Sequence, residues 1–222
     1  KGIGVPEEIV PDTRSAQPQT AQRDQGEEAR LAAQLLGEDV EQEARGGEVY
    51  RYTSPRGVLQ FHSDGSFWAE LEEEAFPLEG GGQAAALGVL EKLGFSGEVI
   101  EQGSRSVTVR QSWSGGALFN QQATVLWSQT GITEITSGRR LYGVPVRDTT
   151  RESIDRATAL IGFYNGLNQM GDVCSRVDAI VPGYLTVTSL NKEMLLTPVW
   201  QVTTDTGAYR LDLVSGELER LG

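Results

Sequence analysis

The sequence predicts an α+β fold in which each helix packs on one face of an antiparallel sheet. Three observations predict it. Apolar residues recur at helical spacing in three segments, runs of alternating apolar and polar residues follow each segment, and glycines stand where strand turns are expected. Because this pattern recurs along the chain, we expect repeated units, each made of a helix and an antiparallel meander.

Composition divides the chain into three parts. Residues 1–25 contain three prolines among polar residues and few large apolar side chains, so they are expected to be a disordered tail or linker. Residues 26–143 are expected to form an N-terminal α+β region with two helix-hairpin units. Gly143 and Pro145 interrupt the pattern, and residues 144–222 are therefore expected to form a third, C-terminal α+β unit.

The three predicted helices differ in how their ends are marked. The first two cover about Glu27 to Leu36 and Gln83 to Leu93, and each is followed by a glycine, which is favoured just past a helix end. The third is expected to begin at Thr149, which forms a capping box with Glu152. Its buried stripe is then expected to consist of Ile154, Ala157, Ile161 and Tyr164.

Three glycines, Gly65, Gly131 and Gly207, each precede a strand of alternating residues. Turn length follows from the requirement that the apolar residues of both strands share one face. This requirement favours three-residue loops that end at Gly65, in the left-handed conformation, and at Gly131, and an even loop such as Thr206–Gly207 in the third hairpin. The apolar faces would carry Leu59, Phe61, Phe67, Ala69 and Leu71, then Val125, Trp127, Thr133 and Ile135, then Trp200, Val202, Tyr209, Leu211 and Leu213.

Charge and composition exclude several classes of partner. The net charge of −12 argues against nucleic acid, because phosphates would repel the chain. Cys174 is the only cysteine, so an intramolecular disulfide and a multi-cysteine metal site are excluded. The sequence contains no run of about 18 apolar residues, the length that a membrane-spanning helix needs. We therefore expect membrane contact only through a segment that lies outside this sequence.

The residues also suggest no catalytic constellation, and we expect a protein that is not an enzyme and has no cofactor or metal ion. His62, the only histidine, lies beside a turn, where the adjacent Ser and Asp cannot align with it for nucleophilic catalysis. Cys174 has no histidine near it in sequence and is expected to be structural. The acidic run within residues 70–74 lacks the spacing of a calcium loop, and Gly80–Gly82 lacks the Lys-Ser/Thr of a phosphate loop.

Trp68 is the one candidate functional residue. Alternation places it on the strand face opposite Phe67 and Ala69, together with Gln60 and His62, so that a large aromatic side chain points away from the predicted core. Tryptophan is enriched at interface hot spots, which makes Trp68 a candidate partner contact. The alternative is that another strand or helix covers it.

A C-terminal pattern suggests a family. The stretch Leu196-Thr197-Pro198-Val199-Trp200-Gln201-Val202, followed by Gly207-Ala208-Tyr209 and Ser215-Gly216-Glu217, resembles the C-terminal signature of the YycI and YycH regulatory proteins of Gram-positive bacteria. In that signature a Pro-x-Trp-x-Val strand leads through a turn to a Tyr-containing strand that ends in Thr-Gly-Glu. The chain departs from it with Ser215 in place of Thr and with Leu211-Asp212 in the second strand. The helix-and-strand units also resemble PepSY modules.

The resemblance implies an extracytoplasmic, membrane-anchored accessory regulator of a two-component sensor kinase. It would act by protein–protein contact without catalysis, and its partners would be the sensor histidine kinase, a paralogous regulator, or both. Residues 1–25 would then be a juxtamembrane linker, and residues 144–222 a PepSY-like and YycI-like unit.

Two alternatives stay open. A secreted PepSY-like module would bind peptide along a free sheet edge or inhibit a protease, and a concave pocket lined by aromatic residues would favour it. A hydrolase that uses carboxylates alone would require two acids that converge in a cleft.

Overall fold

The computed structural model describes residues 3–222. It has an α+β fold in which three α-helices accompany a large, mostly antiparallel sheet. The α+β class expected from the sequence is confirmed, whereas the expected repetition of helix-plus-meander units stays a prediction. The chain divides into two compact units. Unit 1 combines Lys1–Thr20, Pro145–Val187 and Leu195–Gly222, and unit 2 combines Ala21–Val144 and Thr188–Met194.

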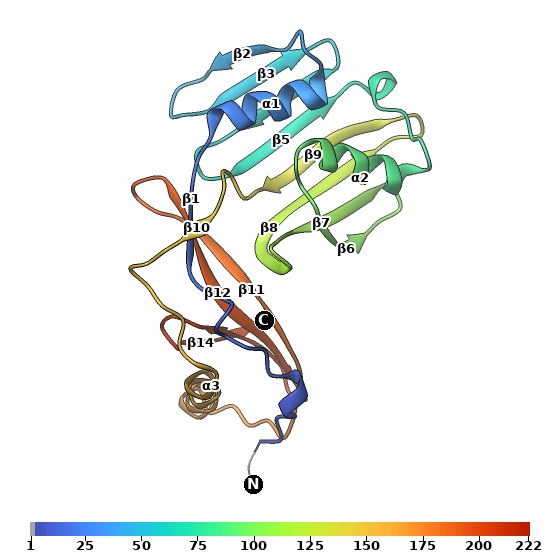
Figure 1. The fold of residues 1–222 in the computed structure, drawn as a ribbon. Helices are drawn as coiled ribbons and strands as arrows, with labels where there is room; N and C mark the ends of the chain where they lie inside the picture. The colour runs from blue at the N-terminus through green and yellow to red at the C-terminus, as the bar shows by residue number, and fades with distance from the viewer. Residues whose placement is uncertain (1–2) are drawn as a thin grey trace. The chain divides into compact units, whose positions relative to one another are not determined.

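In unit 2, each of two helices is followed along the chain by four strands (Figure 1). Helix α1 (Gln25–Leu36) precedes β2 (Glu41–Ala44), β3 (Tyr50–Ser54), β4 (Gly57–Phe61) and β5 (Ser66–Leu71). After a short 3-10 helix, η2 (Glu73–Ala75), helix α2 (Gly82–Lys92) precedes β6 (Gly97–Gln102), β7 (Ser106–Trp113), β8 (Gly116–Trp127) and β9 (Ile132–Arg139). The strands pair in the order β2-β3-β4-β5-β9-β8-β7-β6, so β5 and β9 join the two halves of this sheet.

Both helices of unit 2 pack on the same sheet and share one core. Helix α1 contacts β3 and β4, and α2 contacts β7, β8 and β9. The core contains leucines from both helices and every second residue of the strands, among them Leu35, Leu59, Phe67, Leu90 and Val125. Period-two alternation places the intervening strand residues on the opposite face, which neither helix of unit 2 covers.

The first two helices agree with the prediction from sequence. Helix α1 ends at Leu36 before Gly37, and its N-cap, Asp24, accepts a hydrogen bond from the Glu27 backbone N at 3.1 Å. Helix α2 matches its predicted bounds to within one residue at each end.

The hairpin predictions are confirmed in part. Phe61 pairs with Phe67 across a three-residue loop, and Gly65 has the expected left-handed φ of +84°. In the second hairpin Val125 pairs with Ile135 as expected, but a bulge shifts the register so that Trp127 pairs with Ile132. The predicted three-residue loop is therefore wrong there, because the bulge takes up Thr133 of β9 and a two-residue loop remains between Ser128 and Gly131.

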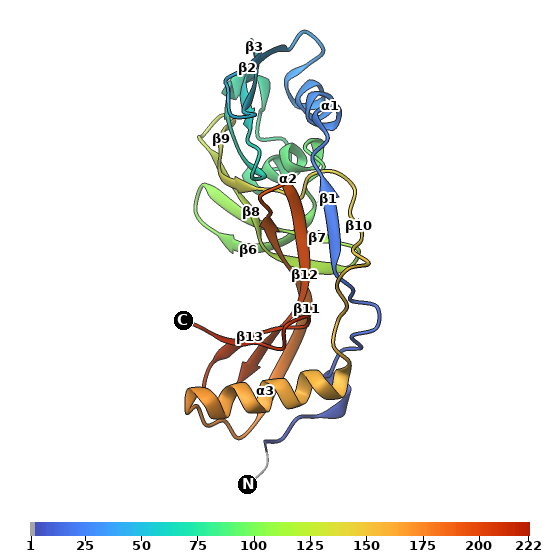
Figure 2. The same cartoon turned by 90° about the vertical axis from the view of Figure 1, so that its left-hand side faces the viewer.

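Unit 1 holds the third helix and the remaining strands, although the ends of β1, β11 and β12 belong to unit 2. Its elements are η1 (Glu7–Ile9), β1 (Gln19–Gln22), β10 (Val146–Arg147), α3 (Arg156–Met170), β11 (Val177–Thr188), β12 (Glu193–Thr204), β13 (Ala208–Asp212) and β14 (Leu218–Leu221). Strands β11, β12, β13 and β14 are neighbours in that order, and β1 pairs with β10. Helix α3 contacts β13 and β14 (Figure 2).

The core of unit 1 forms between α3 and one face of the β12–β13 hairpin. Val202 pairs with Tyr209 and Trp200 with Leu211, and all four are buried. The Thr204 backbone N donates to the Gly207 carbonyl, which leaves a two-residue loop. The even loop expected from the sequence is confirmed, one residue earlier than Thr206–Gly207.

The predicted start of the third helix is wrong. Helix α3 begins at Arg156, and the Asp155 carboxylate caps it by accepting a hydrogen bond from the Thr158 backbone N at 2.9 Å. The predicted capping residues, Thr149 and Glu152, lie outside the helix. The stripe that is buried is Ala159, Phe163 and Leu167, whereas Ile161 and Tyr164 of the predicted stripe are exposed. The i, i+4, i+8 stripe is selected because Phe163 packs edge-on against Tyr209.

The stretch predicted to be a disordered tail, residues 1–25, has regular structure over its described part, residues 3–25. Lys1 and Gly2 lie outside the described residues. It contains η1 and β1, and Val10 is buried in the core of unit 1. The Gly4 backbone N donates to the Ser175 carbonyl at 3.1 Å, and the Val177 backbone N donates to the Gly4 carbonyl at 3.0 Å. These partners are more than 170 positions away, which is why local composition does not reveal them.

Candidate functional site

Trp68 lies on the face of the unit 2 sheet that the unit's helices leave uncovered. Its neighbours along β5, Phe67 and Ala69, are buried on the other face, while Trp68 itself is half-buried. It pairs with Gln60 on β4, and the Arg51 guanidinium lies 5.8 Å from the centroid of its ring. The Trp68 ring is therefore oriented by its neighbours and keeps part of its surface in solvent.

The seam between β5 and β9 forms a shallow depression beside Trp68. The register of the two strands shifts between Phe67 and Ala69, which places Trp68 at a bulge. The depression has a volume of about 380 Å³ and is lined by residues of the two strands. The backbones of β5 and β9 lie close together at Phe67 and Gly138. Only glycine fits at position 138, because a Cβ atom there would lie 2.6 Å from the Phe67 carbonyl oxygen.

Two carboxylates face each other across this seam. Glu70 of β5 pairs directly with Glu134 of β9, and both side chains line the depression. Like charges placed directly opposite on neighbouring strands destabilise a sheet. The pair places two carboxylates in the depression beside Trp68. The sequence alone missed this pairing, because it depends on the register of two strands from different parts of the chain.

The other residues considered from the sequence each contact further residues of the same chain. His62 lies 2.9 Å from the Gln60 side-chain amide nitrogen. Cys174 is buried, and burial together with the nearby Asp205 and Asp172 raises the pKa of its thiol. Gly82 packs against the Trp127 indole, since a Cβ atom there would lie 2.2 Å from the indole Nε1.

The acidic run within residues 70–74 also contributes structural contacts. Glu73 accepts hydrogen bonds from the hydroxyls of Thr130 and Ser128, and these bonds lower the pKa of its carboxyl. Residues 3–222 contain no group of three or more His, Cys, Asp or Glu side chains that could hold a metal ion.

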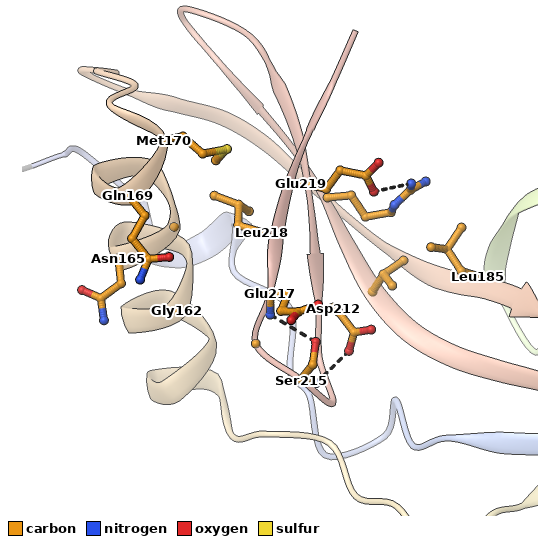
Figure 3. A pocket seen from close by; sticks show the side chains of 14 residues that line it. Gly162, Asn165, Gln169, Met170, Leu185, Asp212, Ser215, Glu217, Leu218 and Glu219 are labelled. Atoms are coloured by element: carbon orange, nitrogen blue, oxygen red, sulfur yellow. Dashed lines mark hydrogen bonds and ion pairs between the residues drawn. The ribbon is translucent and has the colours of Figure 1, made fainter.

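A larger cavity, of about 760 Å³, lies in unit 1 (Figure 3). One part of its lining comes from α3, and another comes from the β13–β14 hairpin, with Leu185 and Val199 from the strands beside it. None of the lining residues is aromatic, so this cavity is not the aromatic-lined pocket expected of a secreted PepSY-like module. Helix α3 reaches β14 closely because Gly166 has no side chain: a Cβ atom there would lie 2.5 Å from the Leu218 Cβ.

The turn between β13 and β14 uses residues quoted for the family resemblance. Gly216 has a φ of +76°, and the Asp212 carboxylate accepts hydrogen bonds from the backbone N atoms of Val214 and Ser215, at 2.7 and 2.9 Å. Ser215 and Glu217 line the cavity on either side of Gly216. The Ser-Gly-Glu sequence thus marks a tight turn and one wall of the cavity, which the sequence alone did not reveal.

None of the helices described here is both long and apolar enough to cross a lipid bilayer.

Comparisons with known proteins give only distant likenesses. No protein-family model matches the chain, and no curated protein matches it. Among solved structures, an uncharacterized protein from Eubacterium rectale ATCC 33656 superposes with a TM-score of 0.49 at 12% identity, over 93% of this chain and 86% of its own. The Bacillus megaterium YpeB C-terminal domain superposes with a TM-score of 0.43 at 13% identity, over 90% of this chain and 99% of its own. Because both TM-scores lie below 0.5, neither likeness identifies a family, and neither supports a specific relationship with YycI or YycH.

Proposed function

We propose that this protein is a non-catalytic regulator that acts by binding another protein through the helix-free face of unit 2. The observation that carries the proposal is Trp68, half-exposed at the β5–β9 seam with Arg51 beside its ring. A tryptophan in this setting offers a large, rigid contact area at a small cost in conformational entropy, which is why such residues dominate binding energy at interfaces.

The charge of the same surface indicates the chemistry of the partner. Glu70 and Glu134 oppose each other next to Trp68, and their mutual repulsion costs stability. A Lys or Arg side chain of a partner would relieve this repulsion and could stack on the indole at the same time. The partner surface is therefore expected to present a basic residue.

The identity of the partner rests on the C-terminal residue pattern. Its resemblance to YycI and YycH supports an extracytoplasmic, membrane-anchored regulator whose partner is a sensor histidine kinase or a paralogous regulator. Trp200, Val202 and Tyr209 of that pattern are core residues, so they support a shared fold more directly than a shared function. The succession of a helix and four strands, at α1, α2 and α3, supports the proposal that the chain repeats a PepSY-like module.

The test uses the purified chain and the extracytoplasmic domains of sensor kinases from the source bacterium. We expect one of these domains to bind the wild-type chain and to bind Trp68→Ala at least tenfold more weakly. Phe119→Ala is the matched control, since Phe119 is a half-buried aromatic that also lies beside an arginine, Arg110, but outside the depression. Equal binding by Trp68→Ala and the wild type would overturn the assignment of the surface. Failure of every kinase domain to bind would overturn the kinase as the partner.

A further inference from the structure

Strand β14 has one unpaired edge. Among the described residues it pairs with β13 alone. The Asp212 backbone N donates to the Glu217 carbonyl at 2.9 Å, and the register continues with Arg210 opposite Glu219. Because hydrogen-bonding direction alternates along an antiparallel strand, the backbone N–H and C=O groups of Leu218 and Arg220 point away from β13.

The cavity of unit 1 borders this edge on both faces of the strand. Leu218 pairs with the core residue Leu211 and lies toward α3, whereas Glu219 pairs with Arg210 on the other face (Figure 3). The cavity is lined by Leu218 and residues of α3 as well as by Arg210 and Glu219. An extended chain placed beside β14 would therefore direct alternate side chains to the two faces.

We propose that the edge of β14 binds an extended peptide as an added strand, and that it prefers peptides with basic side chains at alternate positions. This site involves only unit 1 and does not depend on the role of Trp68. Main-chain hydrogen bonds to Leu218 and Arg220 would provide affinity, and the two sides of the cavity would provide selectivity.

The preference for basic residues follows from charge on the face away from α3. Asp212, Glu217 and Glu219 line this side, and Arg210 is the one basic residue there, paired with Glu219 at 2.6 Å. The Glu217 carboxylate is exposed, and within residues 3–222 no ion pair or side-chain hydrogen bond engages it. This side therefore carries an excess of negative charge that a Lys or Arg of the peptide would complement.

The apolar residues of the cavity also favour Lys or Arg side chains in the peptide. Leu185 is half-buried and Val199 is buried on this face. The aliphatic stem of a Lys or Arg can cover such a surface while its charged head remains in water. The α3 side of the cavity presents Asn165, Gln169 and Met170, which carry no charge, so the alternate peptide positions are expected to hold small apolar residues.

The probe is an acetylated, amidated hexapeptide that alternates Val and Lys, with binding to the full chain measured by calorimetry. The matched peptide that alternates Val and Glu should bind at least tenfold more weakly. Two N-methylated versions of the basic peptide carry methyl groups on either the odd or the even backbone nitrogens. We expect one version to lose binding and the other to retain it, because only alternate N–H groups face β14. The proposal would be overturned if the two N-methylated versions bound equally, if the acidic peptide bound as tightly as the basic one, or if the basic peptide did not bind at millimolar concentration.

Variants of the protein distinguish the contribution of the β14 backbone to peptide binding from the contribution of its side chains. Arg220→Pro removes an N–H that points away from β13, a position where an edge strand tolerates proline, while Arg220→Ala removes the same side chain and keeps the N–H. We expect Arg220→Pro to bind the basic peptide at least tenfold more weakly than Arg220→Ala, with both folded by circular dichroism. Glu217→Gln should also weaken binding of the basic peptide. Trp68→Ala should bind the peptide like the wild type, which keeps a failure here distinct from a failure of the proposed regulator function. Equal binding by the two Arg220 variants, or pairing of β14 with a second copy in place of the peptide in sedimentation, would contradict the proposal.

Discussion

Glu28 accepts two hydrogen bonds from Arg23 in the interior of unit 2, from Nε to Oε1 and from Nη2 to Oε2, each at 2.8 Å. The side chains of Glu28 and Arg23 are 1% and 8% exposed. The buried Arg140 adds an ion pair to Glu27, with a distance of 3.2 Å between Nη2 and Oε2. The Arg140–Glu27 pair joins the first turn of α1 to the segment that follows β9, 113 positions along the chain.

Removing one partner of the buried pair should be far more costly than removing an exposed ion pair. Arg23→Ala removes the bidentate partner of the buried Glu28 carboxylate and leaves it only the ion pair with Arg140 at 3.8 Å. Loss of one partner of a buried pair costs up to about 3–5 kcal/mol in the free energy of unfolding. Arg45→Ala is the control, because the Arg45–Glu43 pair, at 2.9 Å, is solvent-exposed and such pairs contribute about 0–1 kcal/mol. Urea unfolding of both variants measures the difference, and similar losses would contradict the structural role of the Arg23–Glu28 pair.

Substitution by alanine should cost more stability at Gly65 than at Gly115, a glycine with a similar backbone conformation. Gly65 and Gly115 have φ angles of +84° and +78°, so alanine is strained at either position by about 1–2 kcal/mol. At Gly65 a Cβ atom would also lie 2.8 Å from the Arg140 carbonyl oxygen and 2.8 Å from the Met194 Cε, whereas at Gly115 it would meet nothing within 4 Å. We therefore expect Gly65→Ala to lose about 1–3 kcal/mol more than Gly115→Ala in thermal or urea unfolding. Equal losses would show that the turn of the first hairpin does not pack as described.

The stability that the Asp155 N-cap gives to α3 should depend on pH. Hydrogen bonds from the backbone N and the hydroxyl of Thr158 hold the pKa of the Asp155 carboxyl below its ordinary value. A carboxyl with a lowered pKa in the folded state contributes stability above its unfolded pKa, near 3.9, and loses that contribution as pH falls through the folded value. Asp155→Ala should thus destabilise the protein at pH 6 and converge with the wild type at acid pH. Thr149→Ala should have no effect on α3 at either pH, and a larger effect of Thr149→Ala than of Asp155→Ala would restore the capping box predicted from sequence.

Cys174 should react slowly with thiol reagents in the folded protein. Burial and the nearby Asp205 and Asp172 raise the pKa of the thiol, so both access and the thiolate fraction are reduced. We expect a chromogenic disulfide reagent at pH 8 to react at least a hundredfold faster in urea than under native conditions. Rapid stoichiometric reaction of the native protein would contradict the structural assignment of this cysteine.

Local sequence patterns predicted those features whose cause is local. The left-handed turn at Gly65 and the pairing of Phe61 with Phe67 follow from alternation and from the steric freedom of glycine. The end of α1 at Gly37 follows from the same freedom. The face on which Trp68 lies could also be predicted, because successive residues of a strand alternate sides.

Features set by contacts between distant segments could not be predicted. Two apolar stripes compete on α3, and the choice of Phe163 over Ile161 depends on Tyr209, which lies in another strand. The bulge at Trp127 depends on how β8 and β9 meet, and the opposition of Glu70 and Glu134 depends on the register of β5 and β9. Neither candidate site could be assembled from sequence, since each combines residues from separate strands.

The sequence by itself determined the α+β class, the first two helices and the strand alternation, because these follow from periodicity and from the backbone preferences of glycine within a few residues. The tertiary structure alone decided the buried stripe of α3, the ordered conformation of residues 3–25 and the buried Arg23–Glu28 and Arg140–Glu27 pairs. It also decided which edge of the unit 1 sheet, at β14, lacks a partner among the described residues. The physical reason is that burial and pairing depend on which distant segment lies alongside, and local periodicity carries no record of that neighbour.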